Sequence, residues 1–340
     1  MLKGTATILF DQPPSILSTG IVGGPFEQKA AIKDDFDTFF TDQWMEEKSF
    51  EQAHCHLIEE ACSIAMSKIN LQNEDISFFI HGDLINQITP SNFAASQLNI
   101  PYLGIFNACA TSMEGLAMAA LLLSTNNAEY VLTGAASHNS AAERQFRYPT
   151  EYGSQKPDTA QWTVTGSGIA LLAKEGSGPK VTSATIGKVI DEGMTDPFNM
   201  GGAMAPAAYD TILQHLRDRN IDANYYDYIV TGDLAKYGRE ICIDLFQRNN
   251  QQITIERFLD CGLMIYSKEQ SVFAGASGPA CSAIVTYGHL LKRMQNGEIN
   301  RLLIVATGAL LSPLSVQQKQ SIPCIAHAVS IENIPTGGAS

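Results

Sequence analysis

The chain has 340 residues, of which 45% are hydrophobic and 17% are charged. This profile is typical of a compact globular protein with a large core, and the length suits one large domain or two medium ones. The formal net charge of −13 argues against nucleic acid as a partner and against direct docking on anionic lipid, because both need clustered Lys and Arg.

Neither a membrane span nor a secretory signal is expected. The longest unbroken apolar run, Leu116–Leu123, is far shorter than the roughly 20 residues that cross a bilayer. The first thirty residues have no basic start followed by an apolar stretch. Seven cysteines without a C-x-x-C pair fit a reducing compartment with buried thiols. We therefore expect a soluble, intracellular protein.

Helices and strands are predicted to alternate through the first half of the chain. Apolar residues at helical spacing indicate a helix over 50–69, and a short buried strand with a polar turn follows at 75–84. The next predicted elements are, in chain order, a strand at 102–106, an apolar helix at 113–123, and strands at 130–135 and 168–173. Near-continuous apolar strands between helices indicate an α/β fold with mostly parallel sheets covered on both faces.

The second half repeats this pattern. A helix at 207–219 precedes Asp227–Leu234, which echoes Asp75–Leu84, and Ala280-Cys281 echoes Ala108-Cys109. In each copy the cysteine is followed by a helical segment and a strand, the second copy having its strands at 301–309 and 325–331. Four elements that match in the same order favour an internal duplication. We predict two halves, residues 1–174 and 175–340.

Cys109 is the first candidate for chemistry, because it lies where the strand at 102–106 turns into the helix at 113–123. The N-terminus of a helix favours a thiolate, so this position predicts a lowered thiol pKa. A buried structural cysteine among small residues is the alternative, and the repeat favours a site. A nucleophilic cysteine needs a partner such as histidine. His138 and His327 lie at predicted strand ends, where sites in parallel sheets form, and His138 is the stronger candidate.

Residues 137–165 form an insertion in the first half, between its last two strands, of the kind that often serves as a lid or binding loop. It contains Arg144, Arg147 and Lys156 among aromatic residues. Arginine forks match carboxylates and aromatic faces stack on flat rings, so a flat anionic small molecule suits this loop. A loop whose charges pair internally, or a dimer contact, is equally open.

Other motifs point to no metal or cofactor. Gly20–Gly24 and Gly166–Gly168 lack the spacing of dinucleotide and P-loop motifs, and we interpret them as tight turns. No stretch resembles a calcium-binding loop or a zinc site.

Cys109 and the repeat resemble the thiolase superfamily, whose fold has two pseudo-twofold α/β halves and a nucleophilic cysteine at the corresponding turn. Its condensing members also need His or Asn donors from two turns of the second half. Here those turns read Thr231-Gly232-Asp233 and Gly275-Ala276-Ser277, so both donors are expected to be absent. Since losing one oxyanion donor costs about 10²–10³ in rate, the resemblance implies a fold without condensing activity.

A closer resemblance is to the stage V sporulation protein AD family of spore-forming Firmicutes. It rests on the runs SHNSAAERQFRYPTEYGSQKPDTA (137–160), TVTGSG (163–168), AMAPAA (203–208), DCGLMIY (260–266), ATGALLSP (306–313) and IPCIAH (322–327). This resemblance implies a catalytically silent protein that binds dipicolinic acid. It further implies work with the other stage V A membrane proteins, at the forespore membrane, in moving calcium–dipicolinate from mother cell to forespore. Whether calcium binds with the ligand stays open.

The resulting hypothesis is a dipicolinate pocket in the former substrate cavity, with Arg144, Arg147 or Lys156 holding the carboxylates. The other predicted pocket residues are Cys109, His138, Asp233, Ser277 and His327. Two alternatives remain: a structural adaptor of the membrane channel that binds no ligand, and a residual acyl-thioester-processing enzyme with Cys109 as nucleophile. A homodimer is expected from the thiolase resemblance.

Overall fold

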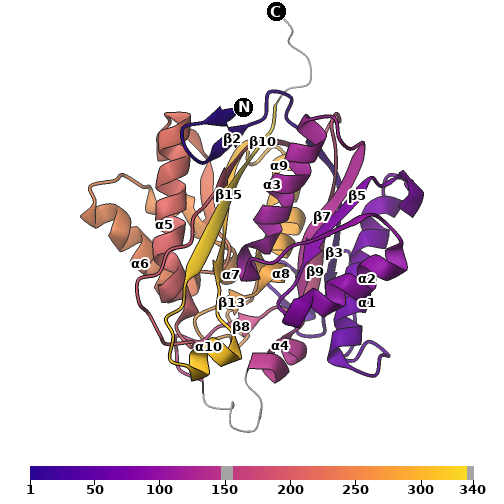
Figure 1. Ribbon diagram of the computed structural model, residues 1–340, viewed down its shortest axis with the longest axis horizontal. Coiled ribbons are helices and arrows are strands. Elements are labelled where there is room, and N and C mark those ends of the chain that lie inside the picture. The colour runs from indigo at the N-terminus through magenta and orange to yellow at the C-terminus, as the bar shows by residue number, and fades with distance from the viewer. Residues whose placement is uncertain (147–155, 335–340) are drawn as a thin grey trace, which may run out of the picture.

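The computed structural model describes residues 1–146 and 156–334. Its strands build a central mixed sheet in which two sets of five strands repeat one order (Figure 1). The first set runs Tyr102–Gly104 (β6), Phe78–Gly82 (β5), Tyr130–Ser137 (β7), Gly166–Ala173 (β9) and Ser15–Gly23 (β3). The second runs Phe258–Asp260 (β12), Tyr228–Thr231 (β11), Arg301–Ala309 (β14), Cys324–Glu332 (β15) and Lys180–Ile186 (β10). Counted along the chain, both sets read third, second, fourth, fifth, first, so the predicted pseudo-twofold α/β fold is confirmed.

Strand direction changes across each set. The three outer strands, β6, β5 and β7, are parallel, and so are β12, β11 and β14. The inner strands pair antiparallel, and β10 meets β3 through the single pair Lys180 and Ser15. The chain start crosses over to the second set, because Thr7–Leu9 (β2) pairs with β10 and carries Leu2–Lys3 (β1) beside it.

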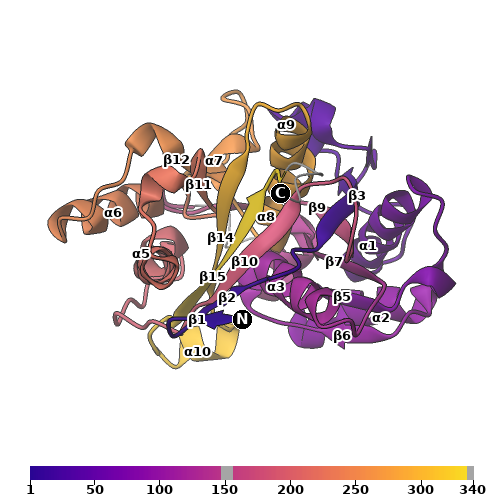
Figure 2. The ribbon, with the colours of Figure 1, turned by 90° about the horizontal axis from the view of Figure 1, so that it is seen from above.

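Helices cover the outer faces and fill the centre (Figure 2). Phe50–Ser67 (α1) and Thr89–Leu98 (α2) lie outside the first set, whereas Met200–Arg219 (α5) and Ala235–Arg248 (α6) lie outside the second. Thr111–Ser124 (α3) and Pro279–Ile284 (α8) are buried in the middle, and α3 packs against strands of both sets. Three apolar clusters follow from these layers, one around α3 and α8, one under α5 and α6, and one under α1 and α2.

The glycine-rich segments predicted to be tight turns lie in strands instead. Gly20 belongs to β3, and a Cβ there would lie 1.9 Å from the carbonyl oxygen of Ala61 in α1. Gly168 belongs to β9, and a Cβ there would lie 2.7 Å from the carbonyl carbon of Ala283 in α8. The prediction was wrong because these glycines serve the close packing of helices on strands, which leaves no local turn signature.

Helix α5 starts seven residues before the predicted helix at 207–219, although Gly201, Gly202 and Pro206 disfavour an isolated helix there. Packing explains the extension. A Cβ on Gly201 would lie 2.2 Å from the carbonyl oxygen of Leu234, and one on Gly238 would lie 2.4 Å from that of Gly201. The glycines therefore let α5 and α6 approach backbone to backbone.

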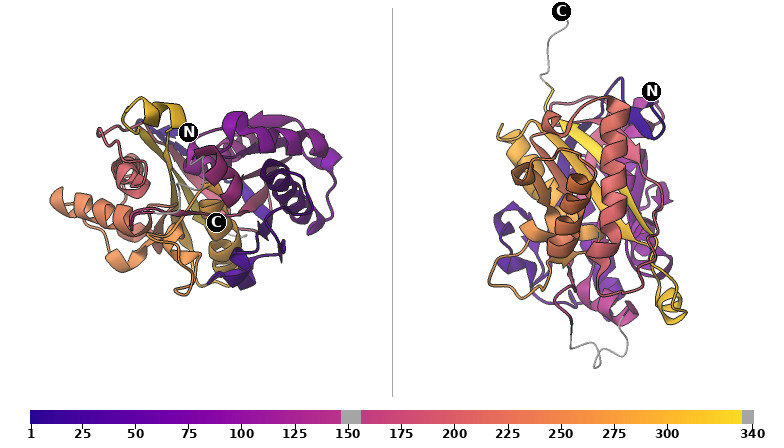
Figure 3. Two further views of the ribbon diagram at one scale, coloured as in Figure 1. Left: turned by 90° about the horizontal axis from the view of Figure 1, so that it is seen from below. Right: turned by 90° about the vertical axis from the view of Figure 1, so that its left-hand side faces the viewer.

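Short elements gather at one end of the molecule. Asn139–Phe146 (α4) and Pro313–Gln317 (α10) lie there, together with the parallel pair formed by Trp162–Thr163 (β8) and Ala276–Ser277 (β13) (Figures 1 and 3). Among the remaining short elements are Thr38–Phe39 (β4), Cys261–Met264 (α7), the π-helical turn Val285–Leu290 and Leu291–Gln295 (α9). No helix in the ranges 1–146 and 156–334 is long and apolar enough to cross a bilayer.

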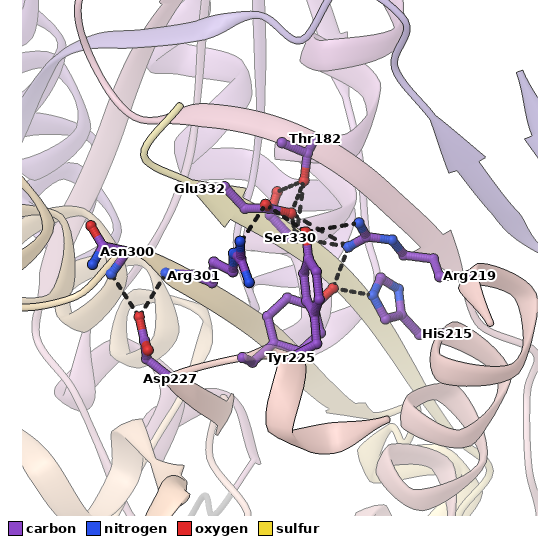
Figure 4. Close-up of polar contacts among 10 residues, drawn as sticks. Thr182, His215, Arg219, Tyr225, Asp227, Asn300, Arg301, Ser330 and Glu332 are labelled. Atoms are coloured by element: carbon purple, nitrogen blue, oxygen red, sulfur yellow. Dashed lines mark hydrogen bonds and ion pairs between the residues drawn. The ribbon is translucent and has the colours of Figure 1, made fainter. Parts of the chain in front are cut away.

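A buried polar network occupies the opposite end, where β15 ends beside α5 (Figure 4). The Glu332 carboxylate pairs with Arg219 at 3.4 Å and accepts hydrogen bonds from Tyr225 at 2.9 Å and Thr182 at 2.7 Å. The Arg301 guanidinium lies 3.9 Å from it. This carboxylate is thus buried beside Arg219, whereas Arg301 reaches it from the exposed side.

A chain of hydroxyl and imidazole groups leads away from Arg219. Arg219 donates to the Tyr226 hydroxyl, which lies 2.6 Å from Nε2 of His215, and Nδ1 of His215 lies 2.7 Å from Oγ1 of Thr185. Thr185 in turn contacts Thr7, which donates to Asp218 at 2.9 Å. Because each hydroxyl has one hydrogen, the cation at one end and the carboxylate at the other fix one direction for every bond. Because burial lowers the pKa of His215 to about 3, the imidazole is neutral, and its one hydrogen is on Nδ1.

Candidate functional site

Cys109 lies in a one-turn 3-10 helix, Ala108–Ala110, between β6 and α3. Ala108 has a φ of +49°, a left-handed conformation that costs a residue other than glycine about 1–2 kcal/mol. Such local strain is characteristic of functional sites. The turn places the Cys109 thiol at the inner end of the central layer, where strands of the second half approach it.

Asp233 and Ser277, from two turns of the second half, converge on Cys109. The Ser277 Oγ lies 3.9 Å from the Cys109 Sγ and donates to the Asp233 carboxylate at 3.0 Å. Asp233 also accepts hydrogen bonds from the Gly278 N–H at 3.1 Å and the Thr307 hydroxyl at 2.9 Å. These are the two turns that the sequence comparison with condensing enzymes singles out.

The turn that carries Asp233 is held by a second buried carboxylate. Asp260 accepts hydrogen bonds from the backbone N–H groups of Leu234 and Ala235 at 2.9 and 3.0 Å and from the Thr231 hydroxyl at 2.6 Å. Burial raises the pKa of Asp260 to about 7, and the nearby charge of Asp233 acts in the same direction.

The electrostatics at Cys109 oppose a thiolate. Burial raises the pKa of the Cys109 thiol well above its usual value, and the charge of Asp233 raises it further. The expected lowering by the helix N-terminus is therefore wrong, because desolvation and a neighbouring carboxylate outweigh the helix dipole. Burial also raises the pKa of Asp233, although the hydroxyl, thiol and amide groups that donate to it act in the opposite direction.

A cavity of about 230 Å³ opens above Cys109. At roughly 30 Å³ for each water in the liquid, its volume equals that of about eight waters. Its polar surface comes from Cys109, Gln161, Thr163, Ser277, Glu143 and Gln317, and its aromatic wall from Phe106, Phe146 and Phe198. Leu84, Ala108, Ala142, Pro197, Met200, Ala309, Leu311, Pro313 and Val316 complete the lining. Glu143 is the one charged residue among the described residues that line it.

Gln161 connects the cavity to the turns beneath it. Its side-chain amide donates to the carbonyl oxygens of Asp233 at 2.7 Å and Ala276 at 3.3 Å. These two acceptors fix the orientation of the amide, so its Oε1 is the free end. This buried oxygen has no hydrogen-bond partner among the described residues.

The two predicted histidines do not line the cavity. His138 is buried behind β7, where its Nε2 lies 2.9 Å from the carbonyl oxygen of Gln43 and its ring stacks on Phe50. His327 in β15 lies 3.2 Å from the Asn107 side chain and accepts the Gly187 N–H. Burial lowers the pKa of each imidazole to about 4, so both are neutral at pH 7.

Of the predicted basic residues, Arg144 points away from the cavity wall, whereas Lys156 lies close to it. Arg144 points from α4 to Glu51 of α1, 3.9 Å away, and is mostly exposed. Lys156 is largely shielded from solvent, with its Nζ 2.8 Å from Glu143 and 5.4 Å from the centre of the Trp162 ring. It reaches the cavity wall through Glu143. Arg147 lies outside the described residues.

Comparison with known proteins gives the family. The family model described as stage V sporulation protein AD matches residues 4–332. Stage V sporulation protein AD of Bacillus subtilis (strain 168) is 48% identical over 339 residues, which make up 100% of this chain and 99% of that protein. The chain belongs to the stage V sporulation protein AD family. Membership of this family supports a role in stage V of sporulation.

Solved structures agree on the thiolase-like fold. The 3-oxoacyl-[acyl-carrier-protein] synthase III of Aquifex aeolicus VF5 is 12% identical, with a TM-score of 0.58 over 94% of this chain and 99% of that one. OleA from Xanthomonas campestris, in a variant form, is 14% identical, with a TM-score of 0.61 over 96% of this chain and 99% of that one. At these identities the likeness concerns the fold alone.

Sequence reasoning missed Gln161 and the aromatic residues outside the insertion, Phe106 and Phe198. Phe146 belongs to the insertion whose aromatic residues were expected to stack on a flat ring, whereas Glu143 entered only through the alternative of internal charge pairing, which matches its contact with Lys156. Gln161 stands between Ala160 and Trp162 without any motif. Its placement depends on the pairing of β8 with β13, a contact between segments more than a hundred residues apart.

Proposed function

We propose that this protein is a non-catalytic subunit that binds dipicolinate during stage V of sporulation, and that the ligand occupies the cavity above Cys109. The observation that carries the proposal is the shape of this cavity, which joins an aromatic and aliphatic wall to a polar floor. A flat ring with polar groups on one edge suits such a lining, because apolar side chains hold the ring and a few polar groups orient it.

The absence of catalysis is part of the proposal. Cys109 is paired with Asp233 and Ser277, and of the described residues that line the cavity none is a histidine or an asparagine. A raised thiol pKa and a neighbouring carboxylate disfavour both the nucleophile and any oxyanion. The alternative acyl-thioester chemistry predicts a covalent adduct on Cys109 after incubation with an acyl-CoA.

Lys156 is the proposed partner of a ligand carboxylate among the described cations, because it is largely shielded from solvent and pairs with Glu143, which lines the cavity. Arg147 is proposed as a second partner from the neighbouring segment. Arg144 is withdrawn from this role, since it extends toward α1. The acidic Glu143 at the cavity wall is compatible with calcium that enters together with the ligand.

Isothermal titration with dipicolinate, with and without calcium and with benzoate as control anion, tests the proposal. Saturable binding selective for dipicolinate is expected. Ser277→Ala is expected to weaken it about tenfold, the equivalent of one hydrogen bond of about 1.4 kcal/mol, whereas the exposed Ser63→Ala leaves it unchanged. Lys156→Ala is expected to weaken binding and Arg144→Ala to leave it intact. An equal response to benzoate, or no heat at all, would favour an adaptor without a ligand.

We further propose that the protein works as a homodimer, attached to the forespore membrane through the other stage V A proteins. The support for a dimer is β6, which is the outermost strand of its set and pairs only with β5 among the described strands. Leu103 on this strand and Phe93 on α2 are exposed large apolar residues. An unpaired edge of this kind is a template for pairing with a second copy. Light scattering of Leu103→Lys should then show monomers.

A further inference from the structure

The buried carboxylate of Asp233 beneath the floor of the cavity would repel the proposed ligand, which is an anion. Dipicolinate carries two carboxylates, which are ionised near neutral pH because an ordinary carboxyl has a pKa near 4. Asp233 lies directly beneath Ser277 and Cys109, with 1% of its surface exposed. Two carboxylates this close in a desolvated site repel each other strongly. The inference below rests on the proposed function.

The groups that surround Asp233 do not relieve this repulsion. The ionisable groups whose pKa the charge of Asp233 raises include the thiols of Cys109, Cys261, Cys281 and Cys324 and the carboxyl of Asp260. These groups come from the 3-10 turn before α3, from α7, α8, β15 and β12, and none of them is a cation. Thr307 of β14 and Ser277 of β13 face Asp233 with neutral hydroxyls.

Counting hydrogens shows what an ionised Asp233 does to the floor. The Ser277 and Thr307 hydroxyls each have one hydrogen, and both are directed at the carboxylate, as is the Cys109 thiol. The Gln161 amide nitrogen donates to two backbone carbonyls, and the side-chain atom left without a partner is the acceptor oxygen Oε1. The side chains of Cys109, Ser277 and Gln161 therefore offer lone pairs to the cavity, which opposes an anion at this part of its lining.

One added proton changes the Ser277 hydroxyl from a hydrogen-bond acceptor into a donor towards the cavity. A protonated Asp233 can donate its hydrogen to Ser277 Oγ, 3.0 Å away, and Ser277 can then turn its own hydrogen towards the cavity. We propose that a carboxylate ligand binds in this cavity together with one proton from solvent, and that Asp233 holds this proton and so converts Ser277 into a donor to the ligand. Asp233 is thus a positioning residue, which acts on the ligand through Ser277.

Proton uptake makes binding depend on pH. Since the complex holds one proton more than the free partners, affinity rises as pH falls, and it changes by up to tenfold per pH unit once free Asp233 is ionised. Burial, which raises the pKa of Asp233, brings this transition nearer to neutral pH.

The test is titration calorimetry with dipicolinate in calcium-free solution, in buffers that differ in ionisation enthalpy, between pH 6 and 8.5. The intact protein is expected to take up about one proton per ligand. Asp233→Asn replaces the carboxyl with a neutral isostere, so it is expected to bind without proton uptake and with an affinity that no longer depends on pH. Asp83→Asn is the matched control, because Asp83 is equally buried but is not among the residues that line the cavity, and its carboxylate accepts hydrogen bonds from Ile85 and Ser91. This variant should still take up about one proton per ligand bound.

The outcomes separate this inference from the function beneath it. Saturable binding without proton uptake in the intact protein would overturn the inference and leave the dipicolinate proposal standing. Undiminished uptake in Asp233→Asn would assign the proton to the ligand or to Glu143 and also overturn it. No binding at any pH would remove the proposed function itself. If Asp233→Asn does not fold, Ser277→Ala is measured instead, and unchanged affinity together with unchanged proton uptake in that variant would overturn the inference.

Discussion

Two buried carboxylates at opposite ends of the molecule show how one group can serve structure or binding. Glu332 and Asp233 both accept hydrogen bonds from hydroxyl groups and both lie out of solvent. Glu332 is paired with Arg219, so its negative charge is compensated within the network of Figure 4. Asp233 has neutral or acidic neighbours, and its hydrogens can be redistributed. A carboxylate buried with its cation fixes a fold, whereas one buried without a cation leaves a proton free to move.

The same isosteric change at both sites tests this difference most directly. Glu332→Gln is expected to lower the free energy of unfolding by about 3 kcal/mol, because it leaves the largely buried Arg219 without its partner. Asp233→Asn is expected to change it by less than about 1 kcal/mol at pH 7, since it removes a charge whose burial is unfavourable. Urea unfolding measures both. Equal losses would mean that Asp233 is also a structural carboxylate.

The pH dependence of stability gives a second, smaller contrast. Burial lowers the pKa of His215 to about 3, so the unfolded state binds more protons than the folded one below about pH 6.5. Stability supported by neutral His215 is present above that pH and is lost as pH falls. Between pH 6.5 and 4.5 its share of the loss is about 2 kcal/mol, and His215→Gln should lose that much less. His56→Gln, on the half-exposed face of α1, serves as the control in urea titrations at both pH values.

Tyr226→Phe tests the continuity of the hydrogen-bond chain. It removes the hydroxyl between Arg219 and His215 and leaves the imidazole acceptor buried without a donor. The expected cost is about 1–2 kcal/mol of unfolding free energy. In Tyr287→Phe the lost hydroxyl donates to a backbone carbonyl of Ser112 at 3.2 Å, so it measures the cost of a single bond outside the chain. A cost at Tyr226 no larger than this would show that the chain acts as separate bonds.

The smallest expected effect concerns the reactivity of Cys109. Alkylation by iodoacetamide at pH 8 should be slow, because burial and Asp233 hold the thiol pKa high. Asp233→Asn removes the neighbouring charge and should raise the rate a few-fold, as followed by mass spectrometry of the Cys109 peptide. Rapid labelling of the intact protein, or an acyl adduct lost in Cys109→Ala, would revive the enzymatic alternative.

The sequence predicted seven of the ten strands in the two sets, because buried strands leave continuous apolar runs, but it did not predict β3, β10 or β12. Tyr130–Ser137 and Arg301–Ala309 were both expected within two residues of their observed ends. The convergence of Asp233 and Ser277 on Cys109 was foreseen by alignment with thiolase turns, since a duplicated fold keeps its turns in register. Side-chain direction at strand ends was not foreseeable. His138 follows Ser137, whose hydroxyl bonds to the Val164 carbonyl, and one residue of difference sends the imidazole to the opposite face.

The predicted thiol pKa failed for a related reason. A helix N-terminus is visible in sequence, but the desolvation that opposes it depends on which distant segments close over the turn. Asp233 is 124 positions away along the chain, and no local pattern reports its distance from Cys109.

The crossing of the chain start has a consequence for fragment complementation. Residues 7–9 pair with β10, and Thr7 bonds to Thr185 and Asp218. If the chain is cut between residues 174 and 179, the first fragment therefore carries β2, a strand that pairs with the sheet of the second fragment. The central helix α3, which belongs to the first fragment, would also lose its packing against β14 and β15 of the second. We expect two such fragments to be insoluble when expressed separately and to reassemble into a native heterodimer when expressed together.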